Sequence, residues 1–315
     1  MVDNGLLRAK RISGGERMIR SNSFVRFAVG NPLSILFLLS ACALPSPITS
    51  RQPFDFAQGQ PPTASSQPPT ATRQLPTPTP SDSGWLSLDP GLDRREIVVP
   101  FYDLGFAERL ILFRIDPSSF TFRVRYSPGF PRYVSEWDPS TTLRAGPTTA
   151  RLVFNAGFFD ENNAALGLLV SDGQSFGASY RDLGGMFAVV EGRPSIRSLI
   201  FQPYELIEPL EQAVQSFPTL IYPDGSPFDK EDNVRARRTA LGQDAAGRVY
   251  LVIAPHNAFT LAELAAWLHA SDLGLTIALN LDGGGSTGYS AGRYDKIDSL
   301  VPIPAVIAVY PRSDP

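Results

Sequence analysis

The sequence is poor in the residues that usually build disulfides and metal centres. Its 315 residues contain one cysteine and two histidines, and neither His256 nor His269 belongs to a motif with metal-ligand spacing. A single cysteine excludes an intramolecular disulfide, so the folded part must be stable without one and without thiolate metal ligands. The chain also lacks an excess of charge of one sign, because its net charge is -3 and no arginine-rich block occurs. We therefore expect neither a zinc enzyme nor a nucleic-acid partner.

The first 41 residues lack an apolar run long enough to span a bilayer, but they have the pattern of an export signal. Arg20 and Arg26 precede the apolar residues 33–41, which end in the order Leu-Ser-Ala before Cys42. This order resembles a bacterial lipobox, which implies cleavage before Cys42, lipidation of its thiol and anchoring on the extracytoplasmic face of the membrane. An ordinary secretory signal and an uncleaved anchor are the alternatives. Either Met1 or Met18 can be the start.

Residues 42–83 are rich in proline, serine, threonine and glutamine. Such a composition offers too few apolar groups to offset the entropy lost on ordering, so we predict a disordered, extended linker. The folded domain is expected at residues 84–315. Strand-length apolar or alternating runs occur in it at 96–102, 109–116, 120–126, 152–154, 166–171, 186–190, 195–200, 215–222, 239–242, 249–254 and 277–279.

One helix is predicted clearly. Thr260 and Glu263 form a capping box ahead of apolar residues at helical spacing, which continue to about residue 271. Glu263 is therefore interpreted as a cap and not as a catalytic group.

The stretch TIALNLDGGGSTGYS, residues 276–290, is the strongest candidate for a functional loop. A short apolar strand ends at Asn280, and Asp282 is followed by three glycines. Consecutive glycines are typical of sites where φ is positive or where a ligand approaches the backbone. The N–H groups of residues 283–286 are candidates for an anion cradle with Asp282 at its lip. The alternative is a tight turn in which Asp282 bonds its own backbone.

A second stretch repeats this pattern, because a strand at residues 152–154 ends at Asn155. Asn155 offers both a donor and an acceptor, Phe158 and Phe159 are candidates for a pocket wall, and Asp160 is a candidate acid, base or ligand. The alternative is a capped turn with both phenylalanines in the core.

Three arginines, Arg235, Arg237 and Arg238, precede the strand predicted at 239–242. One of them is expected to bind a phosphate or carboxylate through its bidentate guanidinium. Solvation at the surface is the alternative, and it is favoured for Arg235.

Seven stretches, in order, resemble the motifs of the phosphodiester glycosidase family. They are NAGFFD (155–160), LGLLVSDGQ (166–174), GMFAVVEGRPSI (185–196), QSFPTLI (215–221), RRTALG (237–242), TLAELAAWL (260–268) and ALNLDGGGST (278–287). The resemblance covers about residues 94–310. It implies an α+β (or α/β) fold, expected as a single mixed-sheet domain with few helices, and hydrolysis of a sugar 1-phosphodiester to the free sugar and a phosphomonoester.

The resemblance also implies the site residues. Asp282 and Asp160 are the expected catalytic carboxylates, and the expected substrate-binding residues are Asn155, Phe158, Arg238, Asn280, Gly283, Gly284, Gly285 and Ser286. The sequence departs from the family at Ala156, where a second glycine is common, which bears on how closely a substrate approaches that turn.

Asp282 is expected to act as nucleophile or as base for water, and Arg238 and the glycine loop to bind the leaving phosphate. A separation of the two carboxylates of about 5 Å would favour retention and a wider gap inversion. No cofactor is required, although a calcium or magnesium site built from Asp and Asn oxygens stays open.

Two alternatives concern function. One is a lipid-anchored, non-catalytic module that binds cell-envelope glycans or exopolysaccharide through Phe158 and the glycine loop. The other is a metal-dependent phosphodiesterase on the same fold, which would break the P–O bond. The expected partners are a glycan or sugar phosphodiester and, through Cys42, the membrane.

Overall fold

The computed structural model describes residues 81–101, 104–138, 149–180, 182–230, 233–293 and 295–312. The predicted signal peptide, Cys42 and residues 42–80 of the predicted linker lie outside these ranges. Among the described residues, no helix is long and apolar enough to cross a bilayer.

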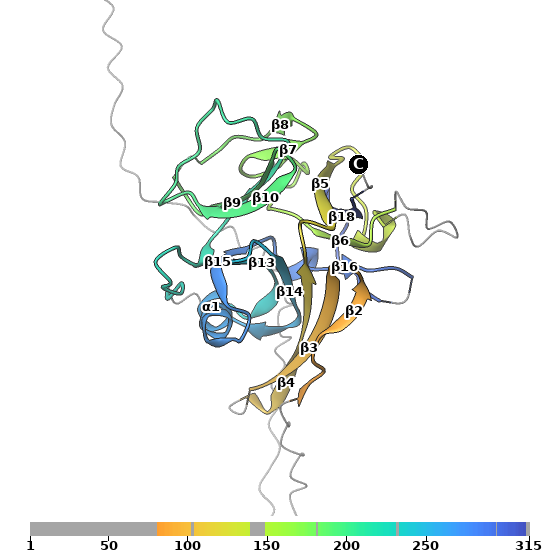
Figure 1. The fold of residues 1–315 in the computed structure, drawn as a ribbon, viewed down its shortest axis with the longest axis vertical. Helices are drawn as coiled ribbons and strands as arrows, with labels where there is room; N and C mark the ends of the chain where they lie inside the picture. The colour runs from red at the N-terminus through yellow and green to blue at the C-terminus, as the bar shows by residue number, and fades with distance from the viewer. Residues whose placement is uncertain are drawn as a thin grey trace, which may run out of the picture. The chain divides into compact units, whose positions relative to one another are not determined.

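The described strands form three sheets (Figure 1). The first contains, in spatial order, β1 (Ser81–Asp82), β3 (Leu92–Phe101), β4 (Phe106–Ile115), β14 (Val249–Phe259), β13 (Ala236–Asp244), β15 (Leu275–Asn280) and β12 (Thr219–Ile221), with β2 (Leu86–Asp89) also paired to β3. The second contains β10 (Arg193–Ser198), β9 (Gly185–Val190), β11 (Gln212–Ser216), β7 (Leu169–Ser171) and β8 (Gln174–Phe176). The third contains β17 (Lys296–Ile297), β16 (Tyr289–Ser290), β6 (Leu152–Asn155), β18 (Ala305–Pro311) and β5 (Phe120–Tyr126).

The expectation of a sheet-rich domain with few helices is confirmed, but the expectation of mixed sheets is wrong. Every strand pair within the described residues is antiparallel. Parallel neighbours need long crossover connections, usually helices, whereas several neighbouring strands here are joined by hairpins, such as β3–β4 and β9–β10. The expected α+β class is not confirmed, because this part of the chain is mostly β-sheet. It contains one α-helix, α1 (Leu261–Ala270), beside two 3₁₀ turns, η2 (Val134–Glu136) and η4 (Gly284–Ser286).

Helix α1 connects β14 to β15 across the strand that lies between them, β13. Its capping box is present, because Glu263 N–H donates to the Thr260 hydroxyl (3.2 Å) and Thr260 N–H donates to the Glu263 carboxylate (3.0 Å). Glu263 also forms an ion pair with Arg235, which donates to the Ala258 carbonyl as well. The interpretation of Glu263 as a cap is confirmed, and Arg235 is engaged with it.

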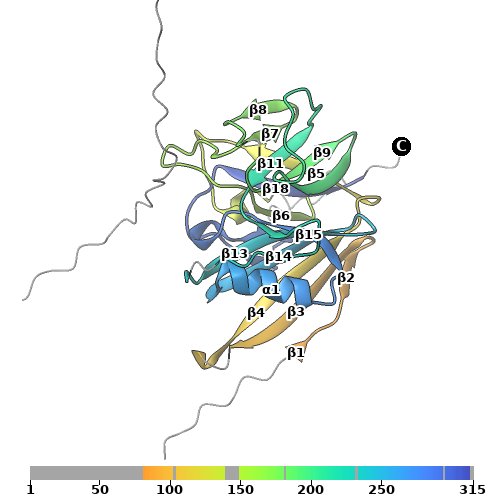
Figure 2. The ribbon, with the colours of Figure 1, turned by 90° about the vertical axis from the view of Figure 1, so that its left-hand side faces the viewer.

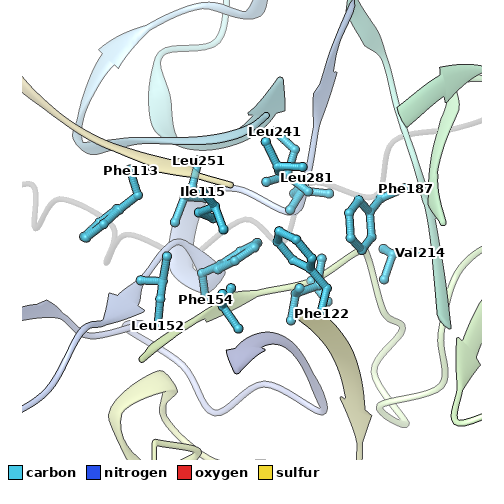
Figure 3. Close-up of a cluster of buried hydrophobic side chains, with 14 of the residues drawn as sticks. Phe113, Ile115, Phe122, Leu152, Phe154, Phe187, Val214, Leu241, Leu251 and Leu281 are labelled. Carbon is cyan, nitrogen blue, oxygen red and sulfur yellow. The ribbon is translucent and has the colours of Figure 1, made fainter. Parts of the chain in front are cut away.

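The two faces of the eight-stranded sheet pack into different cores, as the alternation of side chains along each strand requires. One face contributes Leu241 and Leu251 to a large cluster shared by all three sheets (Figure 3). The other face contributes Ala240 and Val252 to a cluster covered by α1, which lies along β13–β15 in Figure 2. Residues of β13 therefore point alternately toward the shared core and toward the helix.

The start of the described chain is attached to the domain by Arg95 on β3, whose side chain is largely buried. Strand β1 pairs with β3, and the Arg95 guanidinium donates to Asp82 (Nε to Oδ1, 2.9 Å) and to both carboxylate oxygens of Asp272 (2.9 Å each). Asp272 follows α1, so one side chain joins β1, β3 and the end of the helix.

Candidate active site

The two stretches singled out in the sequence meet in the structure. Strand β6 ends at Asn155 in the third sheet, and β15 ends at Asn280 in the first. Asp282 N–H donates to the Ala156 carbonyl (3.1 Å), and the Asn155 side-chain amide donates to the Asp282 carbonyl (2.7 Å). We refer to residues 281–288 as the Asp282 loop.

Asn155 holds the Asp282 loop in place. Its side chain is 1% exposed, and its Oδ1 accepts hydrogen bonds from the Thr239 hydroxyl (2.8 Å) and from Gly288 N–H (3.1 Å). An amide oxygen has two lone pairs, so both acceptor positions of Asn155 are used within the protein. The hydrogen bonds of the Asn155 side chain therefore connect β6, β13 and the Asp282 loop.

The Asp282 loop is partly satisfied by its own polar groups. Gly283 N–H donates to Asp282 Oδ1 (2.8 Å), and Ser286 N–H donates to the Gly283 carbonyl (3.1 Å) in the η4 turn. Asp282 thus bonds its own backbone, as the turn interpretation expects. Of the four N–H groups predicted to form an anion cradle, at most those of Gly284 and Gly285 are left for a ligand.

Asp282 has an unusual environment for a carboxylate. The residue keeps some solvent contact, but protein atoms surround most of its carboxyl group. This burial raises its pKa to about 6, and the hydrogen bonds from the Ser286 side chain and Gly283 N–H act in the opposite direction. A pKa near neutrality suits a group that must exchange a proton during a reaction.

An aromatic pair lies beside the end of β15. The Asn280 side-chain amide donates to the Phe217 carbonyl (2.8 Å), and the Phe217 ring packs on Phe158 with centroids 4.7 Å apart. Phe217 is 42% exposed, so the pair offers an apolar surface to a ligand. Phe217 was not among the predicted site residues, although it lies in the QSFPTLI motif.

Asn280 is buried, and its Oδ1 has no hydrogen-bond partner among the described residues. A buried acceptor without a partner is costly unless something else satisfies it. This oxygen is a candidate contact for a hydroxyl or water brought to the site.

Asp160 closes the turn that follows Phe158. Its Oδ1 accepts hydrogen bonds from the N–H groups of Asn162 (2.9 Å) and Ala164 (2.8 Å), and its own N–H donates to the Ala164 carbonyl (2.9 Å). The pKa of Asp282 is shifted by burial and two hydrogen bonds, with no contribution from Asp160. The structure thus shows a turn-forming role for Asp160, and its part in catalysis stays a prediction.

The two neighbouring arginines of β13 have different partners, and they lie where the pairing of β13 with β14 shifts register. Arg238 is 8% exposed and donates from Nε to the Phe259 carbonyl (3.1 Å) and from Nη2 to the Val234 carbonyl (2.5 Å). Arg237 donates from Nη2 to the Asp298 carbonyl (2.9 Å). The guanidinium of Arg238 is thus engaged with backbone carbonyls next to α1.

Two open surface depressions lie elsewhere on the described residues, and they lack the features of this site. Both have a volume of about 500 Å³, and they are lined by residues of the β10–β11 connection and β15, and of β5 and the β7–β8 turn, respectively. Neither is lined by a residue of the Asp282 loop, and neither combines an aromatic pair with a carboxylate of raised pKa.

Within the described residues, no group of three or more His, Cys, Asp or Glu side chains gathers as a metal site. Such a group is the usual arrangement for zinc. Calcium and magnesium also accept amide, carbonyl and water oxygens, so a need for either ion stays a prediction.

Comparison with known proteins identifies the family of the chain. The sequence profile of a family described as phosphodiester glycosidase matches residues 148–310, more than half of the chain, and this range contains all of the predicted catalytic and substrate-binding residues. A search of curated proteins finds no match.

Two solved structures share the fold. One is the catalytic domain of zebrafish N-acetylglucosamine-1-phosphodiester alpha-N-acetylglucosaminidase, auto-inhibited by its pro-peptide, with a TM-score of 0.53, 19% identity and coverage of 74% of this chain and 88% of that one. The other is a hypothetical protein from Synechocystis, with a TM-score of 0.50, 15% identity and coverage of 75% and 64%.

Proposed function

Because the chain belongs to the phosphodiester glycosidase family, we propose that it is an exported hydrolase that cleaves the glycosidic C–O bond of a sugar 1-phosphodiester. The products are the free sugar and a phosphomonoester. Lipidation of Cys42 would hold the enzyme on the extracytoplasmic face of the membrane. Its substrate there is a cell-envelope glycan or an exopolysaccharide.

The observation that carries this proposal is the state of Asp282. Its carboxyl group has a pKa raised to about 6, at the point where β6, β13 and β15 meet. At neutral pH most of this group is ionised, yet it is a stronger base than an ordinary aspartate. It can therefore accept the proton of an attacking water, or attack the anomeric carbon directly.

The reaction has little need of a general acid to protonate the leaving group. Either water or Asp282 forms a bond to the anomeric carbon, while the bond from that carbon to the phosphate oxygen breaks and the phosphate keeps the electron pair. When water attacks, Asp282 takes its proton. When Asp282 attacks, water then displaces the carboxylate from the anomeric carbon and releases the free sugar. The departing phosphomonoester is already a weak base, so its protonation is less necessary than for a sugar alcohol. This is consistent with an arrangement in which Asp160 is occupied with its own turn.

The surroundings supply binding. The Phe158 and Phe217 rings, which are tilted against each other, offer an apolar surface on which a sugar face can pack. The unpaired Asn280 oxygen can accept a sugar hydroxyl, and Asn155 keeps the Asp282 loop in position for both contacts.

The test is hydrolysis of sugar 1-phosphodiesters in ¹⁸O-water by the purified protein, with and without EDTA, beside Asp282→Asn. Label in the released sugar with little turnover by the variant is the expected result. Label in the phosphate would show a phosphodiesterase and contradict the proposal. Absence of turnover across a broad panel would favour a glycan-binding module, and loss of activity with EDTA would show a metal requirement.

A further inference from the structure

Arg237 is a buried cation beside the Asp282 loop, and the described residues compensate its charge poorly. The residue is 6% exposed, and no carboxylate of the described residues lies within ion-pair distance of its guanidinium. Nη2 donates to the Asp298 carbonyl (2.9 Å). Nε and Nη1 are buried and find no partner in the same part of the chain.

The nearest carboxylate is already occupied. Asp298 accepts hydrogen bonds from Ser135 N–H (3.0 Å), the Ser135 hydroxyl (2.5 Å) and Ser299 N–H (3.2 Å). Burial lowers the pKa of Arg237, and the charge of Asp298 only partly opposes this effect. A buried charge without its full set of partners destabilises a folded protein, and it favours the binding of an opposite charge.

The backbone of Arg237 lies against Gly283. A Cβ added to Gly283 would come within 2.9 Å of the Arg237 carbonyl oxygen, so only glycine allows this approach, and within 4.0 Å of Cδ of Arg238. The Arg238 guanidinium itself is directed to the carbonyls of Val234 and Phe259. On the other side, the segment that receives the Arg237 guanidinium is joined to the loop, because Leu300 N–H donates to the Gly285 carbonyl (2.7 Å). The Arg237 backbone thus borders the glycine loop, and its guanidinium binds a segment that is hydrogen-bonded to that loop.

The loop is open to a ligand at its middle. A Cβ added to Gly284 would have no neighbour within 4 Å, although the positive φ of Gly284 (+57°) favours glycine there. An anion at this position would be near the N–H groups of Gly284 and Gly285, on the loop that borders Arg237. In a low-dielectric site, the charge of Arg237 acts over several ångströms even without direct contact.

We infer that Arg237, and not Arg238, supplies the positive charge that binds the phosphate group of the ligand at the Asp282 loop. This inference rests on the proposed function for the identity of the substrate, but the anion site itself can be tested alone. The ligand class is a phosphomonoester or phosphodiester, and inorganic phosphate is its simplest member.

Arg238 is a matched control, because it is the next residue on the same strand and equally buried. Its guanidinium donates to two backbone carbonyls, so its replacement removes a charge with structural partners. Arg237→Met and Arg238→Met therefore lower the net charge by the same amount with different consequences.

The experiment measures the binding of inorganic phosphate to the full-length protein and the two variants by ³¹P NMR titration, together with thermal unfolding in phosphate-free buffer. The wild type is expected to bind phosphate. Arg237→Met is expected to weaken binding roughly ten- to a hundredfold, because it removes a unit charge that acts on the anion through a low-dielectric site. Arg238→Met should keep phosphate affinity within about threefold, because its guanidinium is directed to the carbonyls of Val234 and Phe259.

Stability distinguishes a ligand-binding arginine from a structural one. Without phosphate, Arg237→Met should unfold at the same temperature as the wild type or higher, because replacing a poorly compensated buried charge is neutral or stabilising. Arg238→Met should unfold at a lower temperature. A protein that fails to fold after Arg237→Met would contradict the inference, since the guanidinium would then be structural.

The outcomes separate this inference from the proposed function. Turnover of sugar phosphodiesters with normal kcat/KM in Arg237→Met overturns the inference and leaves the function standing. Phosphate binding that depends on Arg237 in a protein without turnover supports the anion site and contradicts the hydrolase. Equal loss of phosphate affinity in both variants, or no phosphate binding by the wild type, overturns the inference.

Discussion

Neutralising Asp282 should stabilise the protein while it removes activity. Asp282→Asn keeps the shape of the side chain and an oxygen that can accept the Gly283 N–H hydrogen bond. What it removes is a negative charge that the folded protein surrounds with its own atoms. The variant therefore shows how much the charge of Asp282 lowers folding stability and, separately, whether that charge is needed for activity.

The magnitude follows from the pKa. Raising the pKa of Asp282 from its ordinary value to about 6 means that the folded state disfavours its charge by about 3 kcal/mol. Because the unfolded carboxyl ionises near its ordinary pKa, the unfolded state loses its proton first as the pH rises. The wild type thus loses stability between about pH 4 and pH 6 and carries the full cost above it.

The assay is urea or thermal unfolding of both proteins at pH 7.5 and at pH 4. At pH 7.5 the variant should be more stable by about 2 to 3 kcal/mol, or roughly 5 to 10 °C in Tm for a domain of this size. At pH 4 the difference should shrink toward zero, since both side chains are then largely neutral in the folded state.

Asp244→Asn is the control, because its carboxylate has the opposite shift. Burial raises the pKa of Asp244, but hydrogen bonds from Arg248 and Tyr250 outweigh this effect and lower it overall. Its neutralisation should therefore destabilise the protein at pH 7.5. The reasoning is refuted if Asp282→Asn is no more stable than the wild type at pH 7.5, or if its advantage is the same at both pH values.

Three further predictions concern the site. If Asp282 acts in its ionised form, kcat/KM should fall about tenfold for each pH unit below about 6 and level off above pH 7 in a pH–rate profile; activity that rises below pH 6 would contradict this role. Phe217→Ala should raise KM by roughly tenfold with a smaller effect on kcat, measured by steady-state kinetics, because it removes half of the aromatic surface; an unchanged KM would exclude a role in binding. Asn155→Ala should destabilise the protein by about 2 to 4 kcal/mol in urea unfolding, since it leaves the Thr239 hydroxyl and Gly288 N–H buried without an acceptor; a cost below about 1 kcal/mol would show that water replaces it.

The sequence identified the two motifs that form the candidate site, but not the hydrogen bonds that each of their residues makes. A strand that ends at Asn155 and another that ends at Asn280 were both recognisable from apolar runs broken by polar residues and glycine. The two hydrogen bonds that Asn155 Oδ1 accepts, from Thr239 and Gly288, could not be predicted, because these partners come from distant parts of the chain. Hydrogen bonds of this kind depend on the register of three sheets.

The choice between Arg237 and Arg238 shows the same limit. Alternation along a strand predicts that the two side chains face opposite ways, but not which face carries the Asp282 loop. That depends on β6 and β15 lying beside β13, a tertiary arrangement. The family resemblance covered both arginines in one motif and did not separate them. Only their partners in the folded structure do so.

Arg95 has a mechanical consequence for the chain. The first described strand is β1, so a force applied to the chain at Ser81 reaches the fold at a two-residue strand. Arg95 lies on β3 and donates hydrogen bonds to Asp82 and Asp272, so it links β1 to the end of α1. Strand β3 is in turn paired along its whole length with β4. The Asp282 loop is held by other strands, β6 and β13. A force that releases Asp82 would therefore free β1 before it disturbed the Asp282 loop, so Arg95 protects the site from force applied at Ser81.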